Sequence, residues 1–178
     1  HSQIVKTANS KKWVQVDLGK REKIASVTMH ACYDDFAGIG AGFGFPVRFK
    51  IIASNKADFS RSEVLVDQTE KKFPNPKLVP LNFKVNSHAR YFRVEAVELT
   101  ERKNDFIFAL AELELLNADD LNLAAGKKVT AEDSIEAPIR WRKSNLTDGK
   151  WSKSKNPEIQ KELLALVDDR KSLIESLS

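Results

Sequence analysis

The chain has 178 residues, of which 42% are hydrophobic and 30% charged, as expected for one soluble domain with a core, with or without an appendage. Lys and Arg exceed Asp and Glu by 29 − 25 = +4, and the signs are interspersed, so the basic face of a nucleic-acid-binding protein is not expected. The one cysteine, Cys32, excludes an intramolecular disulfide, and no apolar run approaches the ~20 residues that span a membrane.

Alternation of apolar and polar residues predicts β-strands over most of residues 13–116. Within 24–32 the set that contains Val27 and Met29 is apolar and should face the core, which places His30 on the opposite face, toward solvent or a binding surface. The predicted strands lie at 13–18, 24–32, 47–54, 64–66, 79–85, 90–99 and 106–116. Short strands without helices between them predict an all-β antiparallel sandwich or jelly roll.

Residues 34–46, DDFAGIGAGFGFP, contain four of the seven glycines. They do not match the dinucleotide fingerprint, and a predicted strand follows where a helix N-terminus would be needed, so a nucleotide site is not expected. Two interpretations remain. The glycines supply positive φ angles in a long connection, or the stretch is a binding loop with Tyr33, Asp34 and Asp35 at its mouth.

The sequence changes character after residue 117. Six basic residues and one acid, Asp148, lie between Arg140 and Lys155, which is typical of a solvated loop and, as an alternative, of a polyanion site. Residues 156–178 predict an amphipathic C-terminal α-helix, with Asn156 as N-cap and Pro157 at the first helical position. Such a helix needs a packing partner, either the sandwich or another protein.

Candidate catalytic constellations are poor, because no nucleophile motif or metal-protease motif accompanies the histidines. We therefore expect no enzyme. The polar cluster Arg102, Asn104 and Asp105 stands just before Phe106, and polar groups around aromatic rings suit sugar hydroxyls, or else form a solvated turn. Glu112, in the last predicted strand, has apolar neighbours and needs a cation or a hydrogen-bond partner.

Four segments occur in the order WVQVDLG, IASVTMHA, RYFRVEA and FALAELELL. Together they resemble the discoidin family, the coagulation factor 5/8 type C domains, which are galactose-binding-like and related to carbohydrate-binding modules. The resemblance covers about residues 13–116 and implies a jelly-roll β-sandwich with ligand loops at one end. DDFAGIGAGFGFPVRFKI and RKNDFIFALAELE look like a subgroup found in large secreted planctomycete-type bacterial proteins, which implies a secreted, cell-surface or periplasmic location.

One feature departs from that family. Its members begin with segments like NLAAGKKVTA and LTDG, which here come late, at 122–131 and 146–149. Either a second module starts at Asn122, or residues 122–152 fold back as a permuted first strand and ion loop of one module spanning 1–155. We favour the fold-back, because the remaining tail is helical and no second WVQVDLG follows.

The resemblance also implies a structural Ca²⁺, since the family's Asp-Gly loop and final-strand glutamate often hold one. The matching residues are Asp148, with Asn145 and Thr147 nearby, and Glu112. These supply oxygen ligands, as Ca²⁺ requires, but do not complete a coordination shell.

The resulting hypothesis is a non-catalytic binding module, carbohydrate-binding, within a larger secreted or surface bacterial protein. The predicted recognition surface consists of Tyr33, Asp34, Asp35, Arg102, Asn104 and Asp105, with His30 as a weaker candidate. The alternative is a protein-interaction or spacer domain that binds partners through its C-terminal helix. A phospholipid-binding surface built on exposed aromatics is less expected.

Overall fold

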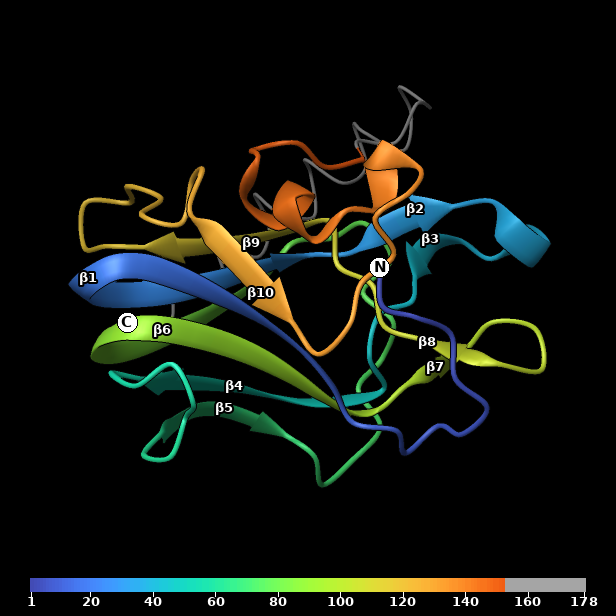
Figure 1. Ribbon diagram of the computed structural model, residues 1–178, viewed down its shortest axis with the longest axis horizontal. Coiled ribbons are helices and arrows are strands. Elements are labelled where there is room, and N and C mark those ends of the chain that lie inside the picture. Colours follow the sequence, from blue (N-terminus) through green and yellow to red (C-terminus); the bar gives the residue numbers. More distant parts are fainter. Residues whose placement is uncertain (153–178) are drawn as a thin grey trace, which may run out of the picture.

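The computed structural model describes residues 1–152, in which β-strands are the main regular structure (Figure 1). The predicted C-terminal helix lies outside the described residues. No helix among those described is long and apolar enough to cross a membrane. The strands are β1 (Lys12–His30), β2 (Cys32–Asp34), β3 (Gly40–Phe43), β4 (Arg48–Ser54), β5 (Glu63–Gln68), β6 (Leu81–Glu98), β7 (Thr100–Glu101), β8 (Phe106–Ile107), β9 (Glu112–Leu116) and β10 (Lys128–Ala131). Three short 3₁₀ helices are η1 (Phe36–Gly38), η2 (Ile139–Trp141) and η3 (Lys143–Thr147).

Two long strands, β1 and β6, organise the molecule. They pair antiparallel from Lys12↔Ala96 to Met29↔Leu81, with register shifts at Asp17/Glu22 and Ile24/Ser26. Both strands bend at the left of Figure 1, so that the two halves of each run in different layers. The main sheet has the order β10-β1-β6-β4-β5, and β9 pairs with the second half of β1.

The edge beside the first half of β1 is occupied by a segment from far along the chain. β10 pairs antiparallel with residues 14–17, from Val14↔Ala131 to Asp17↔Lys128. β9 in turn pairs with residues 26–30 of β1, with His30 opposite Glu112. The late segment 128–131 is therefore hydrogen-bonded to the first strand of the sheet.

An apolar core fills the space between the layers. It includes Val16 and Val27 from the two halves of β1, Phe92 from β6 and Leu113 from β9, each 0% exposed. Phe49 of β4 is also fully buried and meets the Phe45 ring edge-on at 5.7 Å. Burial of these side chains is the main stabilising contribution, at roughly 25 cal/mol per Å² of apolar surface removed from water.

The predicted alternation of 24–32 is only partly correct. Val27 and Met29 face the core as predicted, but Ile24 is also buried, because the register shift between Ile24 and Ser26 resets the two-residue period. Of the two predicted alternatives for His30, a place at a binding surface stays a prediction, and exposure to solvent is wrong, since its side chain is 5% exposed. The reason is that a later segment of the chain covers this face of the sheet.

The glycine-rich stretch forms the β2–β3 hairpin, with η1 at its tip, and the turn that follows. Gly42 and Gly44 have φ angles of +81° and +68°, and a Cβ atom would fall 1.8 Å from Asn75 Oδ1 at Gly42 and 2.7 Å from Ala109 Cβ at Gly44. Asn75 Nδ2 donates to the Gly42 carbonyl over 3.2 Å. Both positions need glycine because neighbouring groups crowd a left-handed backbone.

Candidate functional site

Residues 139–152 cover the outer face of β9 and of the second half of β1. The Trp151 ring stacks on His30 at a centroid distance of 4.2 Å. The Gly149 N–H donates to Glu112 Oε1 over 3.1 Å, and the Thr147 hydroxyl donates to the Lys127 carbonyl over 3.0 Å. Leu146 of η3 is 4% exposed and belongs to the core. This covering segment is therefore fixed to the sheet by apolar packing and by hydrogen bonds.

A cleft of about 320 Å³ opens between the covering segment and β2. Three aromatic side chains line it: Tyr33 from β2, Trp141 from η2 and Trp151. Tyr33 is 48% exposed. The charged and amide side chains that line the cleft are Asp34, Arg140, Arg142, Asn145, Asp148 and Lys150. The cleft thus combines ring faces with hydrogen-bonding groups of both charges.

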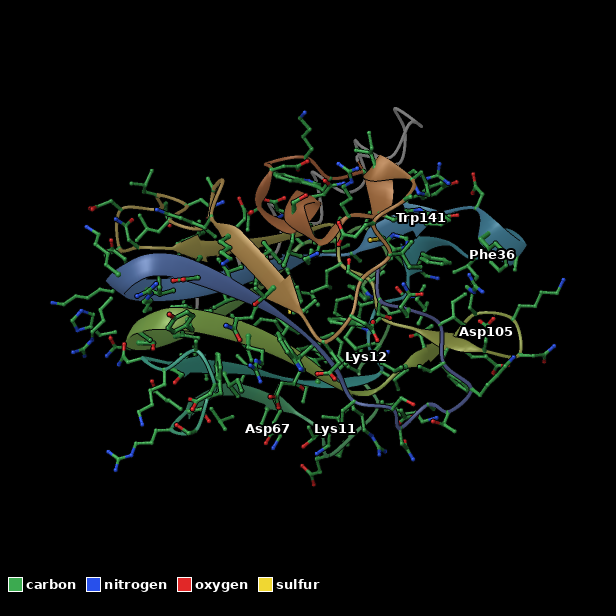
Figure 2. The ribbon with its side chains drawn as sticks, in the orientation of Figure 1. Lys11, Lys12, Phe36, Asp67, Asp105 and Trp141 are labelled. Atoms are coloured by element: carbon green, nitrogen blue, oxygen red, sulfur yellow. The ribbon has the colours of Figure 1, made fainter. Side chains whose placement is uncertain are left out.

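Trp141 is held as a fixed wall of this cleft. Its ring stacks on the His1 imidazole at 5.4 Å, and the Arg140 guanidinium lies 4.8 Å from the ring centroid. His1 stacks in turn on Phe43 at 5.5 Å. The Trp141 Nε1 atom is buried and has no hydrogen-bond partner within residues 1–152. Figure 2 shows Trp141 at the same end of the molecule as Phe36 and Asp105.

The acidic side chains at the mouth hold the local backbone. Asp34 Oδ1 accepts the Phe36 N–H over 3.0 Å, and Asp148 Oδ1 accepts the Lys150 N–H over 2.8 Å. Asp35 accepts the Tyr33 hydroxyl, and this hydrogen bond to a carboxylate raises the pKa of Tyr33. Of the predicted recognition residues, Tyr33 and Asp34 line the cleft, and Asp35 bonds to Tyr33 from beside it.

The structure places Arg102, Asn104 and Asp105 outside the cleft, in the β7–β8 hairpin. The Arg102 guanidinium donates twice to the Asp105 carboxylate, each over 2.9 Å, and lies 4.2 Å from the Phe36 ring centroid. The bond to Arg102 lowers the pKa of Asp105. Asn104 has a φ of 57° in the turn. This cluster braces the hairpin against η1, so the predicted ligand contact of these three residues would need a ligand that extends beyond the cleft.

His30 lies beneath the cleft wall. Its Nε2 is 2.9 Å from Glu114 Oε2, and Trp151 covers its ring. Direct contact with a ligand would require Trp151 to move. His30 therefore does not line the cleft, unlike Tyr33 and Asp34 of the next strand in the chain.

Glu112 is the most unusual polar residue of the described chain. Its side chain is 0% exposed, and Oε2 has no hydrogen-bond partner within residues 1–152. Burial raises the pKa of Glu112 to about 8, and the negative charges of Asp148 and Glu114 add to this effect. A desolvated carboxyl beside other carboxylates, with one oxygen unpaired, is an environment that a cation would relieve.

The other residues of the predicted ion loop lie in η3 and the turn that follows it. Asn145 donates its amide to the Ile139 carbonyl over 2.9 Å, and the Thr147 hydroxyl is 2% exposed. The described residues contain no group of three or more His, Cys, Asp or Glu suited to a metal ion. A cation here would need amide, hydroxyl and carbonyl oxygens beside Glu112 and Asp148, which suits Ca²⁺ better than a transition metal.

Five charged or aromatic lining residues of the covering segment are not among the predicted site residues, namely Arg140, Trp141, Arg142, Lys150 and Trp151. A signal was present, because two tryptophans stand within the basic run 140–155. Tryptophan in a polar loop is uncommon unless the ring packs on something or binds a ligand. The charge of the run by itself favours a solvated loop and does not indicate a ligand site.

Comparison with known proteins gives matches among solved structures only. No protein-family model and no curated protein matches the sequence. Chitosan-binding module 1 of a chitosanase/glucanase from Paenibacillus sp. IK-5 aligns at 14% identity, over 64% of this chain and 74% of that chain, with a TM-score of 0.47. Module 2 of the same enzyme, solved with chitotriose, aligns at 16% identity over 58% and 67%, with a TM-score of 0.42.

The lectin domain of lectinolysin, solved with Lewis B antigen, aligns at 24% identity, over 63% of this chain and 69% of that chain, with a TM-score of 0.43. These neighbours are carbohydrate-binding modules and a lectin domain. Because each TM-score lies below 0.5, the function of this chain is inferred from its own residues.

Proposed function

We propose that this protein is a non-catalytic carbohydrate-binding module whose ligand occupies the cleft beneath the covering segment. The observation that carries this proposal is the combination of Tyr33, Trp141 and Trp151 with amide, carboxylate and guanidinium groups around one cleft of about 320 Å³. Aromatic faces pack on the C–H faces of sugar rings, and polar side chains bond the hydroxyl groups. The volume falls at the low end of the range for small-ligand pockets.

The placement of carboxyl groups supports binding rather than hydrolysis. Glycoside hydrolysis uses two carboxyl groups that flank the scissile bond, one of them with a raised pKa. The strongly raised pKa belongs to Glu112, which is fully buried beneath Gly149 and is not part of the cleft lining. The cleft carboxylates, Asp34 and Asp148, are each bonded to a backbone N–H.

The family assignment belongs to the same proposal. The pairing of β10 with the start of β1 supports one permuted galactose-binding-like module, in which 122–152 supply a first strand and an ion loop of a discoidin-like jelly roll. The sequence resembles a subgroup of that family found in large secreted bacterial proteins, so we place this chain outside the cytoplasm. A partner bound through the predicted helix at 156–178 concerns residues that the structure does not describe.

We further propose a structural Ca²⁺ held by Glu112 and Asp148, with oxygens of Asn145 and Thr147. The unpaired Glu112 Oε2 and the raised pKa of this buried carboxyl support the assignment. A bound cation would neutralise the carboxylates. Both oxygens of Glu112 would then have a partner, Oε1 the Gly149 N–H and Oε2 the cation, and would hold the covering segment on β9.

The direct test is a glycan array followed by calorimetry on the best ligand. Tyr33→Ala and Trp141→Ala remove lining rings and are expected to weaken binding by about tenfold or more. Phe36→Ala is the matched control, because Phe36 is 43% exposed at the same end but does not line the cleft. A well-folded wild-type protein that binds no glycan, or a Tyr33→Ala variant that binds like wild type, would contradict the proposal.

A further inference from the structure

The basic run after residue 139 is divided by the structure into paired and unpaired cations. Lys143 Nζ bonds to the Glu136 carboxylate, and this interaction lowers the pKa of Glu136. Arg140, Arg142 and Lys150 instead line the cleft. None of these three forms an ion pair within residues 1–152. The cations of this run that line the cleft therefore have no carboxylate partner in the described part of the chain.

The two arginines present open donor groups. Arg142 uses Nε to bond the Glu136 carbonyl over 2.9 Å, and no hydrogen bond is found for its terminal nitrogens in the described part of the chain. Arg140 is exposed and contacts the Trp141 ring. A guanidinium presents its donors as a planar fork that matches a carboxylate or a sulfate bidentately, which a neutral hydroxyl cannot exploit equally.

The acidic residues of the cleft do not balance these cations. Asp34 and Asp148 are the two lining carboxylates, against three cationic side chains. A cationic amino sugar would have to approach Arg140, Arg142 and Lys150, and like charges within a site disfavour such a ligand.

From this arrangement we infer that the cleft recognises an acidic glycan, whose carboxylate or sulfate group is held by Arg140 and Arg142 with Lys150 at the rim. This inference rests on the proposed function, and it names the class of sugar. The rings of Tyr33 and Trp141 contact the sugar face, while the arginines select for the anionic substituent. Specificity then depends on charge-assisted hydrogen bonds from the two guanidinium groups.

The test is a glycan array that includes neutral, amino and acidic oligosaccharides, with pairs that differ only in the anionic group. Trigalacturonic acid against its methyl ester tests the carboxylate, chondroitin sulfate against desulfated chondroitin tests the sulfate, and a glucosamine trimer supplies the cationic case. The acidic member of at least one pair is expected to bind about tenfold or more tighter than its partner.

The variants are Arg140→Gln, Arg142→Gln and the double variant, each expected to lose the preference for the acidic member. Arg61→Gln is the matched control, because Arg61 is exposed in the β4–β5 loop and does not line the cleft. Equal binding of the two members in both pairs would overturn this inference, and so would a preference for the glucosamine trimer. Either result would leave the proposed carbohydrate function standing. A blank array with folded protein would overturn the proposed function, and this inference with it.

Discussion

Two clusters of charged and aromatic residues lie at the same end of the molecule, and they differ in whether their cations form ion pairs. In the β7–β8 hairpin, Arg102 is bonded twice to Asp105 and packs on Phe36. In the cleft, Arg140 and Lys150 have no carboxylate partner in the described chain. Both places combine arginine, acidic and aromatic side chains. What distinguishes a structural cluster from a candidate binding site is whether its hydrogen-bonding capacity is already used.

The largest stability effect should come from detaching the cleft wall. Leu146 is 4% exposed and anchors η3 in the core. Leu146→Ala is expected to cost about 2–5 kcal/mol of unfolding free energy, because it leaves a cavity where the covering segment meets the sheets. Urea unfolding gives this value, and calorimetry should show glycan binding lost as well. Leu121→Ala is the matched control, since Leu121 is 60% exposed and should change the free energy by less than about 0.5 kcal/mol.

A second prediction concerns Glu112 in the presence of a chelator. Its folded-state pKa of about 8 lies above the ordinary 4.5, so its contribution to stability is fully present below pH 4.5 and is lost as the pH rises through 8. The free energy of unfolding should fall on the order of 3 kcal/mol between pH 5 and pH 7.5. Urea unfolding across this range measures the fall.

Glu112→Gln should flatten that pH dependence and raise stability at pH 8 when a chelator is present. Ca²⁺ should stabilise wild type at pH 8 and should not stabilise the variant, since the proposed ligand is gone. Glu101→Gln, an exposed substitution in β7, is the control. An unchanged melting temperature of wild type on adding Ca²⁺ and on adding chelator would contradict the ion site.

The smallest expected change in stability is that of the hairpin cluster. Arg102→Ala should lower stability by about 1 kcal/mol, because it breaks a bidentate pair that is partly exposed, and it should leave glycan affinity unchanged. Arg140→Ala should change the free energy of unfolding little and should clearly lower glycan affinity. Equal losses of affinity in the two variants would mean that the hairpin cluster also contacts the ligand.

Much of the fold was predictable, because a half-buried strand imposes its two-residue period on the sequence. The period does not show where a strand bends. Residues 19–23 read as a turn, yet β1 continues through them, since the register shift between Asp17 and Glu22 absorbs the bend. Conversely, the predicted strand 106–116 is two strands, β8 and β9, because residues 108–111 leave the ladder between them.

The candidate site was less predictable, because its two walls are distant in sequence. Tyr33 and Asp34 were identified from the glycine-rich loop beside them. Trp141 and Trp151 become lining residues only because Leu146 and Gly149 hold their segment on β9. The sequence around His30 does not show that Trp151 covers its ring. It also does not show that Arg102 pairs with Asp105, whereas Arg140 forms no ion pair in the described chain.

Carbohydrate binding in the cleft can be followed at the three tryptophans of the chain, because they report on it separately. Trp141 and Trp151 line the cleft, whereas Trp13 lies on β1 beside Arg93 and does not. Titration with the best array ligand, followed through the indole N–H signals in a ¹H–¹⁵N NMR spectrum, should shift Trp141 and Trp151 and leave Trp13 in place. A shift of Trp13 alone, with the other two signals unchanged, would contradict the account.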